Sequence, residues 1–217
     1  MDGPFPRPVE VRSLTDSLAT LSAAAADARH RLAPGQFGDD SPFAAADIWP
    51  VVHELRRRFA PGRRFLEWGS GLGTVTLAAA QIGYDACGIE RDERLVAAAR
   101  DLAQRLAIPA RFAHGNCLPP AVRQALRAGG KQQTSAAADS GEYALSIDGP
   151  DGYAALACAP ADFDVIYVFP HPDQAEFCRR VFAEHARPGA VLLVYSQVSG
   201  VLESVRGADG ASLLRVC

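Results

Sequence analysis

The stretch Phe65-Leu66-Glu67-Trp68-Gly69-Ser70-Gly71-Leu72-Gly73-Thr74 decides how the rest of the chain is interpreted. A short apolar run leads into an acid, three glycines alternate with other residues, and an Ala-rich apolar segment, 75–80, follows at once. This order is typical of a strand, a tight glycine turn and a helix. Glycines permit positive φ and let a ligand approach the backbone, while a helix start offers unpaired N–H groups. We therefore expect an anionic or carboxylate-bearing ligand at this turn.

A regular alternation of strand and helix patterns continues from the glycine turn. The apolar periodicity predicts strands at 63–67, 86–90, 110–113, 163–169 and 190–196, and helices at 72–82, 92–106, 121–128 and 173–186. Strands that alternate with helices indicate an α/β fold with a mostly parallel sheet flanked by helices. The pattern at 142–147 predicts a further strand, 148–152 a turn, and 201–216 a short antiparallel hairpin.

Two helices are predicted ahead of the first strand, at 9–32 and 42–59, with a loop at 37–43 between them. We divide the chain into an N-terminal helical extension, 1–36, and one α/β domain, 37–217. Residues 129–141 have no hydrophobic period and are predicted to be a flexible insert in that domain.

Composition and charge favour a compact protein that does not bind nucleic acids or anionic membranes generically. The chain has 217 residues, of which 48% are hydrophobic, with a net charge of -3 and a pI near 5.9. An acidic balance gives no support to generic nucleic-acid or membrane binding. No apolar run approaches the roughly 20 residues of a membrane span. We expect a cytoplasmic protein, and the charge leaves a specific RNA or protein site open.

The cysteines favour neither a disulfide framework nor a metal site. Their number is odd, and none forms a C-x-x-C pair: Cys87, Cys117, Cys158, Cys178 and Cys217. We expect reduced thiols and no bound metal.

Polar side chains gather at the predicted carboxyl ends of the strands. Glu67, Glu90, Asn116 and His171 each end or follow a predicted strand. Ligands in open α/β sheets bind outside these ends, where the winding of the chain reverses. One edge of the sheet is therefore expected to carry the functional site.

The spacing Glu67-x-Gly69-x-Gly71-x-Gly73, with Glu90 at the end of the second strand, resembles the class I S-adenosylmethionine-dependent methyltransferases. A dinucleotide-binding G-x-G-x-x-G motif would need a third glycine where Thr74 stands. The resemblance covers roughly residues 37–196. It implies a three-layer Rossmann-like sandwich, S-adenosylmethionine as cofactor and methyl transfer as activity. It assigns no subfamily.

The resemblance also implies roles for the residues of the glycine turn. The turn Gly69-Ser70-Gly71, continued by Gly73, would hold the methionine end of the cofactor. Glu67 would face the amino group of the cofactor, directly or through water. The alternative for the glycines is close packing between strand and helix. Trp68 is expected to pack or to line the pocket rather than to catalyse.

Three residues are implied at the nucleoside end. Glu90 would accept hydrogen bonds from both ribose hydroxyls, because a carboxylate offers two oxygens. Asn116 would meet the adenine edge, where the family often has Asp, and Arg91 would cover the adenine face. Glu90 could instead be a helix N-terminal acid, and Asn116 a turn residue.

The residues that act on the acceptor are less defined. The loop Phe169-Pro170-His171-Pro172-Asp173 only loosely resembles the Asn/Asp-Pro-Pro-aromatic loop of amino-group methyltransferases, and its leading residue is Phe169. Methylation of adenine or amides is therefore not supported. His171 is a candidate base or substrate contact, and its alternative role is that of a turn residue.

Two other functions share this fold and these motifs. One is an NAD(P)-dependent oxidoreductase, against which Thr74 counts. The other is a protein that binds S-adenosylmethionine without transferring its methyl group. The sequence indicates neither the methyl acceptor nor the oligomeric state.

Overall fold

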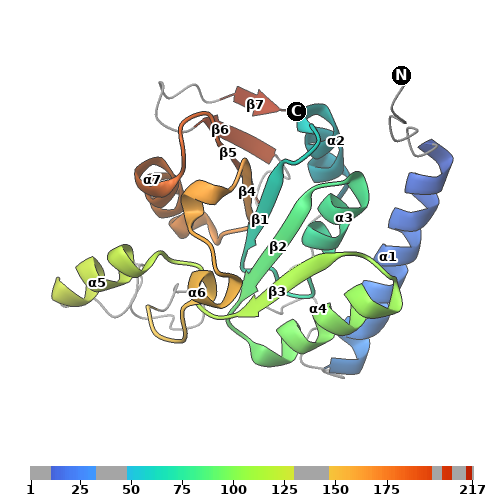
Figure 1. Cartoon of the computed structure of the whole chain (residues 1–217), viewed down its shortest axis with the longest axis horizontal. Helices are drawn as coiled ribbons and strands as arrows, with labels where there is room; N and C mark the ends of the chain where they lie inside the picture. Colours follow the sequence, from blue (N-terminus) through green and yellow to red (C-terminus); the bar gives the residue numbers. More distant parts are fainter. Residues whose placement is uncertain (1–10, 33–47, 130–146, 197–201, 207–213, 217) are drawn as a thin grey trace, which may run out of the picture.

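The computed structural model describes residues 11–32, 48–129, 147–196, 202–206 and 214–216 (Figure 1). In this part of the chain a central sheet lies between two layers of helices. The architecture is the three-layer Rossmann-like α/β sandwich that the alternation of strands and helices predicts.

Seven strands form one sheet in the described part of the chain, in the order β3-β2-β1-β4-β5-β6-β7. The strands are β1 (Arg64–Trp68), β2 (Asp85–Glu90), β3 (Ala110–His114), β4 (Val165–Val168), β5 (Val191–Tyr195), β6 (Leu202–Arg206) and β7 (Leu214–Val216). Pairs among β1 to β5 are parallel, whereas β6 is antiparallel to β5 and β7 to β6. The predicted antiparallel hairpin at 201–216 is confirmed.

The winding of the chain reverses between β1 and β4. From β1 the chain adds β2 and β3 on one side, then crosses back to place β4 and β5 on the other. The crevice outside the carboxyl ends of these two neighbouring strands is the usual ligand position in such sheets.

Helices cover both faces of the sheet (Figure 1). One layer is formed by α1 (Val11–Leu32), α2 (Ile48–Arg58), α3 (Thr74–Ile82) and α4 (Glu93–Arg105). The other is formed by α5 (Pro120–Ala128), α6 (Gly152–Leu156) and α7 (Ala175–His185), with short 3-10 turns η1 (Pro160–Asp162) and η2 (Pro172–Gln174). Two hydrophobic cores result, one on each face.

The central strands owe their position to near-continuous apolar sequence. Every residue of β4 and β5 is buried, as expected for parallel strands covered by helices on both faces. Alternate side chains serve the two cores: Phe65 of β1 and Val165 of β4 face α1 to α4, while Leu66 and Ile166 face the other layer.

Helix α6 was not predicted. The segment 148–152 has the composition of a turn, but Asp151 accepts hydrogen bonds from the backbone N–H groups of Tyr153 and Ala154 and thereby caps a short helix. The predicted loop at 37–43, the start of the predicted helix at 42–59, the insert at 129–141 and most of the strand at 142–147 lie outside the described residues.

Candidate functional site

The glycine turn connects β1 to α3 at the carboxyl edge of the sheet. Gly69, Gly71 and Gly73 have φ values of 70°, 54° and 72°, in the left-handed region that favours glycine. Gly73 immediately precedes α3, which begins at Thr74 rather than at the predicted Leu72. The alternating glycines are therefore required by the backbone of this turn.

The backbone N–H groups of the turn are used within the protein. Gly69 and Ser70 both donate to the carbonyl oxygen of Ile89 in β2, at 2.9 and 3.0 Å, and Gly73 donates to the carbonyl of Ser70 at 2.7 Å. These bonds fix the turn against β2. The expectation of bare N–H groups in the turn itself is therefore wrong for Gly69, Ser70 and Gly73. The first N–H groups of a helix have no partner within that helix, so a ligand would meet N–H groups at the start of α3 instead.

Glu67 supplies the cap that α3 lacks from its own N-terminus. Its Oε2 accepts hydrogen bonds from the backbone N–H and the hydroxyl of Thr76, at 2.8 and 2.5 Å. The side chain is 6% exposed. Burial raises the pKa of Glu67 from 4.5 to about 8, although the bonds from Thr76 lower it, and the charge of Glu90 adds to the rise. The carboxyl group is therefore largely protonated at neutral pH.

Gly69 and Gly73 serve different purposes. A Cβ atom added at Gly69 would meet no atom of the described residues within 4 Å, so these residues leave the backbone open there. A Cβ atom at Gly73 would lie 2.4 Å from the Phe112 ring, so this glycine is needed for close packing of α3 on β3. Gly73 therefore serves close packing, whereas the described residues leave room for another molecule beside the backbone of Gly69.

Glu90 joins the end of β2 to the glycine turn. Its Oε2 accepts from the backbone N–H of Gly71 at 2.8 Å. Its Oε1 accepts from the N–H groups of Arg91 and Asp92, at 2.7 and 2.9 Å. Three backbone dipoles thus hold a half-buried carboxylate beside the turn. Asp92, and not Glu90, caps α4, because its side chain accepts from the N–H of Arg94.

Cys117 lies near this carboxylate, and the sequence reasoning missed it. Burial, and after it the charge of Glu90, raise the pKa of the Cys117 thiol to about 12, although the nearby N–H of Gly69 and the charge of Arg91 lower it. The thiol therefore lies close to the N–H of Gly69 and within electrostatic range of Glu90 and Arg91. Only its position next to Asn116 could have indicated this in the sequence. Arg91 itself is exposed.

Asn116 follows β3, and both polar atoms of its side chain form hydrogen bonds to the backbone. Its Oδ1 accepts from the N–H of Leu118 at 2.8 Å, and its Nδ2 donates to the carbonyl of Asp148 at 3.0 Å. The residue is 4% exposed. Asn116 therefore holds its own turn against the segment 147–151, the alternative role considered for it.

The segment 147–151 is also held from α5. Arg123 donates from Nη1 to the carbonyl of Gly149 at 3.0 Å, and Arg127 donates to the carbonyl of Ile147 at 3.2 Å. Beyond this segment, the Trp68 indole donates to the Tyr153 hydroxyl of α6 at 2.7 Å. Trp68 is buried and packs against α6, as expected for a packing residue.

His171 follows β4 on the same edge of the sheet. Its side chain is 35% exposed, and its Nδ1 lies 3.5 Å from Oδ2 of Asp173. Its carbonyl accepts from the N–H of Gln174, which closes the 3-10 turn η2. His171 thus holds a turn position, and its imidazole is accessible from solvent.

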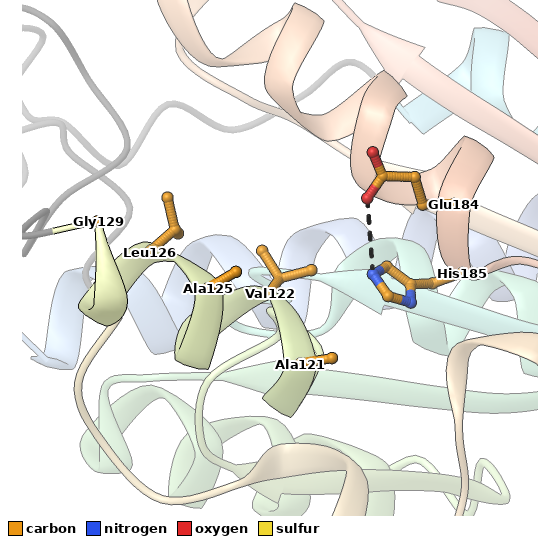
Figure 2. A pocket seen from close by; sticks show the side chains of 7 residues that line it. All are labelled: Ala121, Val122, Ala125, Leu126, Gly129, Glu184 and His185. Carbon is orange, nitrogen blue, oxygen red and sulfur yellow. Dashed lines mark ion pairs between the residues drawn. The ribbon is translucent and has the colours of Figure 1, made fainter.

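A groove of about 480 Å³ lies between α5 and the end of α7. Figure 2 shows aliphatic side chains of α5, including Val122 and Leu126, facing Glu184 and His185. The nearest atoms of this last pair, His185 Nε2 and Glu184 Oε2, are 3.9 Å apart. The groove contains none of the residues of the glycine turn or of the β2 end.

Within the described ranges, no cluster of three or more His, Cys, Asp or Glu side chains could hold a metal ion. No helix among these residues combines the length and apolarity needed to cross a membrane.

Comparisons with known proteins give structural likenesses only. No family model matches the chain, and no curated protein matches it. A putative protein-L-isoaspartate O-methyltransferase from Plasmodium falciparum, solved with S-adenosyl-L-homocysteine, is 14% identical; the match covers 93% of each chain with a TM-score of 0.48. An RNA methyltransferase from Salinibacter ruber, also with S-adenosyl-L-homocysteine, is 17% identical over 70% of this chain and 76% of that chain, with a TM-score of 0.45. An O-methyltransferase from Bacillus cereus is 16% identical; the match covers 87% of this chain and 67% of that chain, with a TM-score of 0.44.

Proposed function

We propose that this protein is an S-adenosylmethionine-dependent methyltransferase that acts on a small molecule or a protein side chain. The observation that carries the proposal is the meeting of two elements at the carboxyl edge of the sheet. The Glu90 carboxylate at the end of β2 accepts a hydrogen bond from Gly71 in the turn after β1. The proposed acceptor for the ribose hydroxyls and the turn proposed to hold the amino-acid end are therefore neighbours.

The methionine end of the cofactor would lie over the glycine turn. The open space beside Gly69 allows a ligand to approach the backbone closely. The cofactor carboxylate would meet the first N–H groups of α3, at Thr74 and Val75, where the helix dipole favours an anion. The cofactor ammonium would pair with Glu67. Ser70, Gly71 and Gly73 would act by fixing the turn rather than by touching the ligand.

The nucleoside end would lie over the end of β2. Glu90 would accept from the ribose hydroxyls, partly in exchange for the N–H groups that it now accepts from. Cys117 and Arg91 would border the adenine ring, and Asn116 would support this wall from behind through its bond to Asp148. A polarizable thiol suits contact with an aromatic ring.

The bound cofactor would supply an electrophilic methyl group on a sulfonium. The chain would contribute by holding donor and acceptor in line, which is worth up to about 7–11 kcal/mol in ideal cases. Where the acceptor must lose a proton, His171 is the proposed base, because its accessible imidazole follows β4 at the same edge.

The test is transfer of a labelled methyl group. Purified protein would be incubated with methyl-labelled S-adenosylmethionine and fractions of a cell lysate, and product would be followed by scintillation counting and mass spectrometry. We expect labelled product with wild type and none with Glu90→Ala. NADH fluorescence is the opposing test, and NADH binding at the expense of S-adenosylmethionine would contradict the proposal.

A further inference from the structure

Among the residues that the structure describes, the buried hydroxyl of Tyr167 has no hydrogen-bond partner. Tyr167 belongs to β4 and is 1% exposed. A buried polar group of this kind costs stability, and phenylalanine would fill the same space without that cost. We take an unsatisfied hydroxyl in a packed core as a sign of a functional role rather than of packing alone.

Tyr167 lies beside Glu67 at the point where the winding of the sheet reverses. The two residues are register partners on the parallel strands β1 and β4, which are about 4.8 Å apart in such sheets. Both side chains point to the face covered by α1 to α4, since both strands alternate in phase. Thr76 bonds to Oε2 of Glu67, so a donor from β4 would meet Oε1.

The polar groups around Glu67 and Tyr167 are acidic or neutral. Apart from burial, the groups that act on Glu67 are the two donors of Thr76 in α3 and the carboxylate of Glu90 in β2. Burial raises the pKa of Tyr167 well above 10, and Glu67 and then Tyr195 of β5 raise it further. None of these neighbours is a cation. A cationic ligand group would therefore be favoured here and would convert Glu67 to its charged form.

We infer that Tyr167 is a positioning residue of the proposed cofactor site, whose hydroxyl donates a hydrogen bond to the Glu67 carboxylate when that carboxylate binds a cationic amine. The inference rests on the proposed function, because the amine is that of the cofactor. In the ligand-free protein the neutral carboxyl group makes no strong demand for a donor. In the complex Glu67 is a charged carboxylate and accepts a strong hydrogen bond. The Tyr167 hydroxyl would donate that bond and hold the carboxylate in one orientation toward the amine.

The test is calorimetric titration of S-adenosylhomocysteine into wild type and Tyr167→Phe, at pH values around the Glu67 pKa of about 8. Loss of a hydrogen bond to a charged group should weaken binding roughly tenfold at neutral pH. The pH at which the affinity reaches its plateau should rise, because the carboxylate is harder to form without its donor. The thermal midpoint of the ligand-free variant should not fall, since no bond is lost there.

Tyr84→Phe is the matched control. Tyr84 is also buried, but its hydroxyl donates to the carbonyl of Leu55 at 2.8 Å, at the opposite edge of the sheet. We expect this variant to lose stability and to keep its affinity and pH profile. Equal affinity and an equal pH profile in wild type and Tyr167→Phe would overturn the role of Tyr167 alone. Absence of binding by folded wild type would overturn the proposed function and this inference together.

Discussion

The Glu90 carboxylate accepts a hydrogen bond from the Gly71 backbone N–H across 2.8 Å, which ties the end of β2 to the turn after β1. The same carboxylate accepts from Arg91 and Asp92, so its two oxygens already receive three donors. A carboxylate has about four lone-pair sites. A ribose with two hydroxyls would therefore have to replace at least one of these bonds, and the Gly71 bond is the one that faces the turn.

Removal of Glu90 should abolish most cofactor affinity. Glu90→Ala loses an acceptor for two ribose hydroxyls, and we expect S-adenosylhomocysteine to bind roughly a hundredfold more weakly. Asp92→Ala is the control, because it removes an adjacent acid that caps α4. That variant should lose about 1 kcal/mol of stability and keep its affinity. Calorimetry with both proteins checks the difference, and equal affinities would contradict the role of Glu90.

The stability of the ligand-free protein should fall as the pH rises through the range governed by Glu67. The unfolded chain releases this proton near pH 4.5, whereas the folded protein holds it until about pH 8. Between these values the folded state binds more protons, so the free energy of unfolding decreases with pH. The difference corresponds to at most roughly 5 kcal/mol.

Glu67→Gln should remove this slope while its amide oxygen still accepts from Thr76. Urea unfolding of both proteins near pH 5 and near pH 8 provides the measurement. The free energy of unfolding of the variant, relative to that of wild type, should be higher near pH 8 than near pH 5. Parallel behaviour of the two proteins would show that Glu67 titrates normally.

The two glycines at the ends of the turn should respond differently to alanine. Gly73→Ala combines positive φ with a Cβ 2.4 Å from the Phe112 ring, and we expect a loss of roughly 2–5 kcal/mol in the free energy of unfolding. Gly69→Ala meets open space, so only the conformational cost of about 1–2 kcal/mol applies. Its methyl group would instead enter the ligand position and weaken cofactor binding. Chemical denaturation and calorimetry separate the two effects, and a reversed order would refute this division of roles.

Asparagine at position 116 should not be exchangeable for aspartate. Asn116→Asp would keep the oxygen that accepts from Leu118 but would place a second oxygen against the carbonyl of Asp148. We expect a loss of about 1–3 kcal/mol in the free energy of unfolding. Urea denaturation tests this, and a variant as stable as wild type would mean that the Asp148 bond contributes nothing.

The sequence predicted the elements of the fold well because its signals are local. The apolar run 163–169 and the Glu67-to-Gly73 turn indicated the central strand and the first crossover, and β4 and α3 lie there. Helix α6 was missed because its cap, Asp151, lies within a run of turn-forming residues. The sheet order β3-β2-β1-β4-β5 depends on contacts between distant segments, which periodicity does not contain.

The same limit applies to the site. Glycines and acids at strand ends could be found by spacing, but their hydrogen-bond partners could not. Thr76 under Glu67, Asp148 behind Asn116 and the unpartnered hydroxyl of Tyr167 all depend on tertiary packing. These contacts show which of the predicted residues support the turn, and the ligand-binding roles stay predictions.

The central claim is that the glycine turn and Glu90 hold S-adenosylmethionine. Its most direct test is calorimetric titration of S-adenosylhomocysteine into folded wild-type protein at neutral pH, with NADH as the competing ligand. We predict saturable binding with one ligand per chain for S-adenosylhomocysteine and no heat of binding for NADH. Absence of S-adenosylhomocysteine binding by a protein shown to be folded would contradict the account.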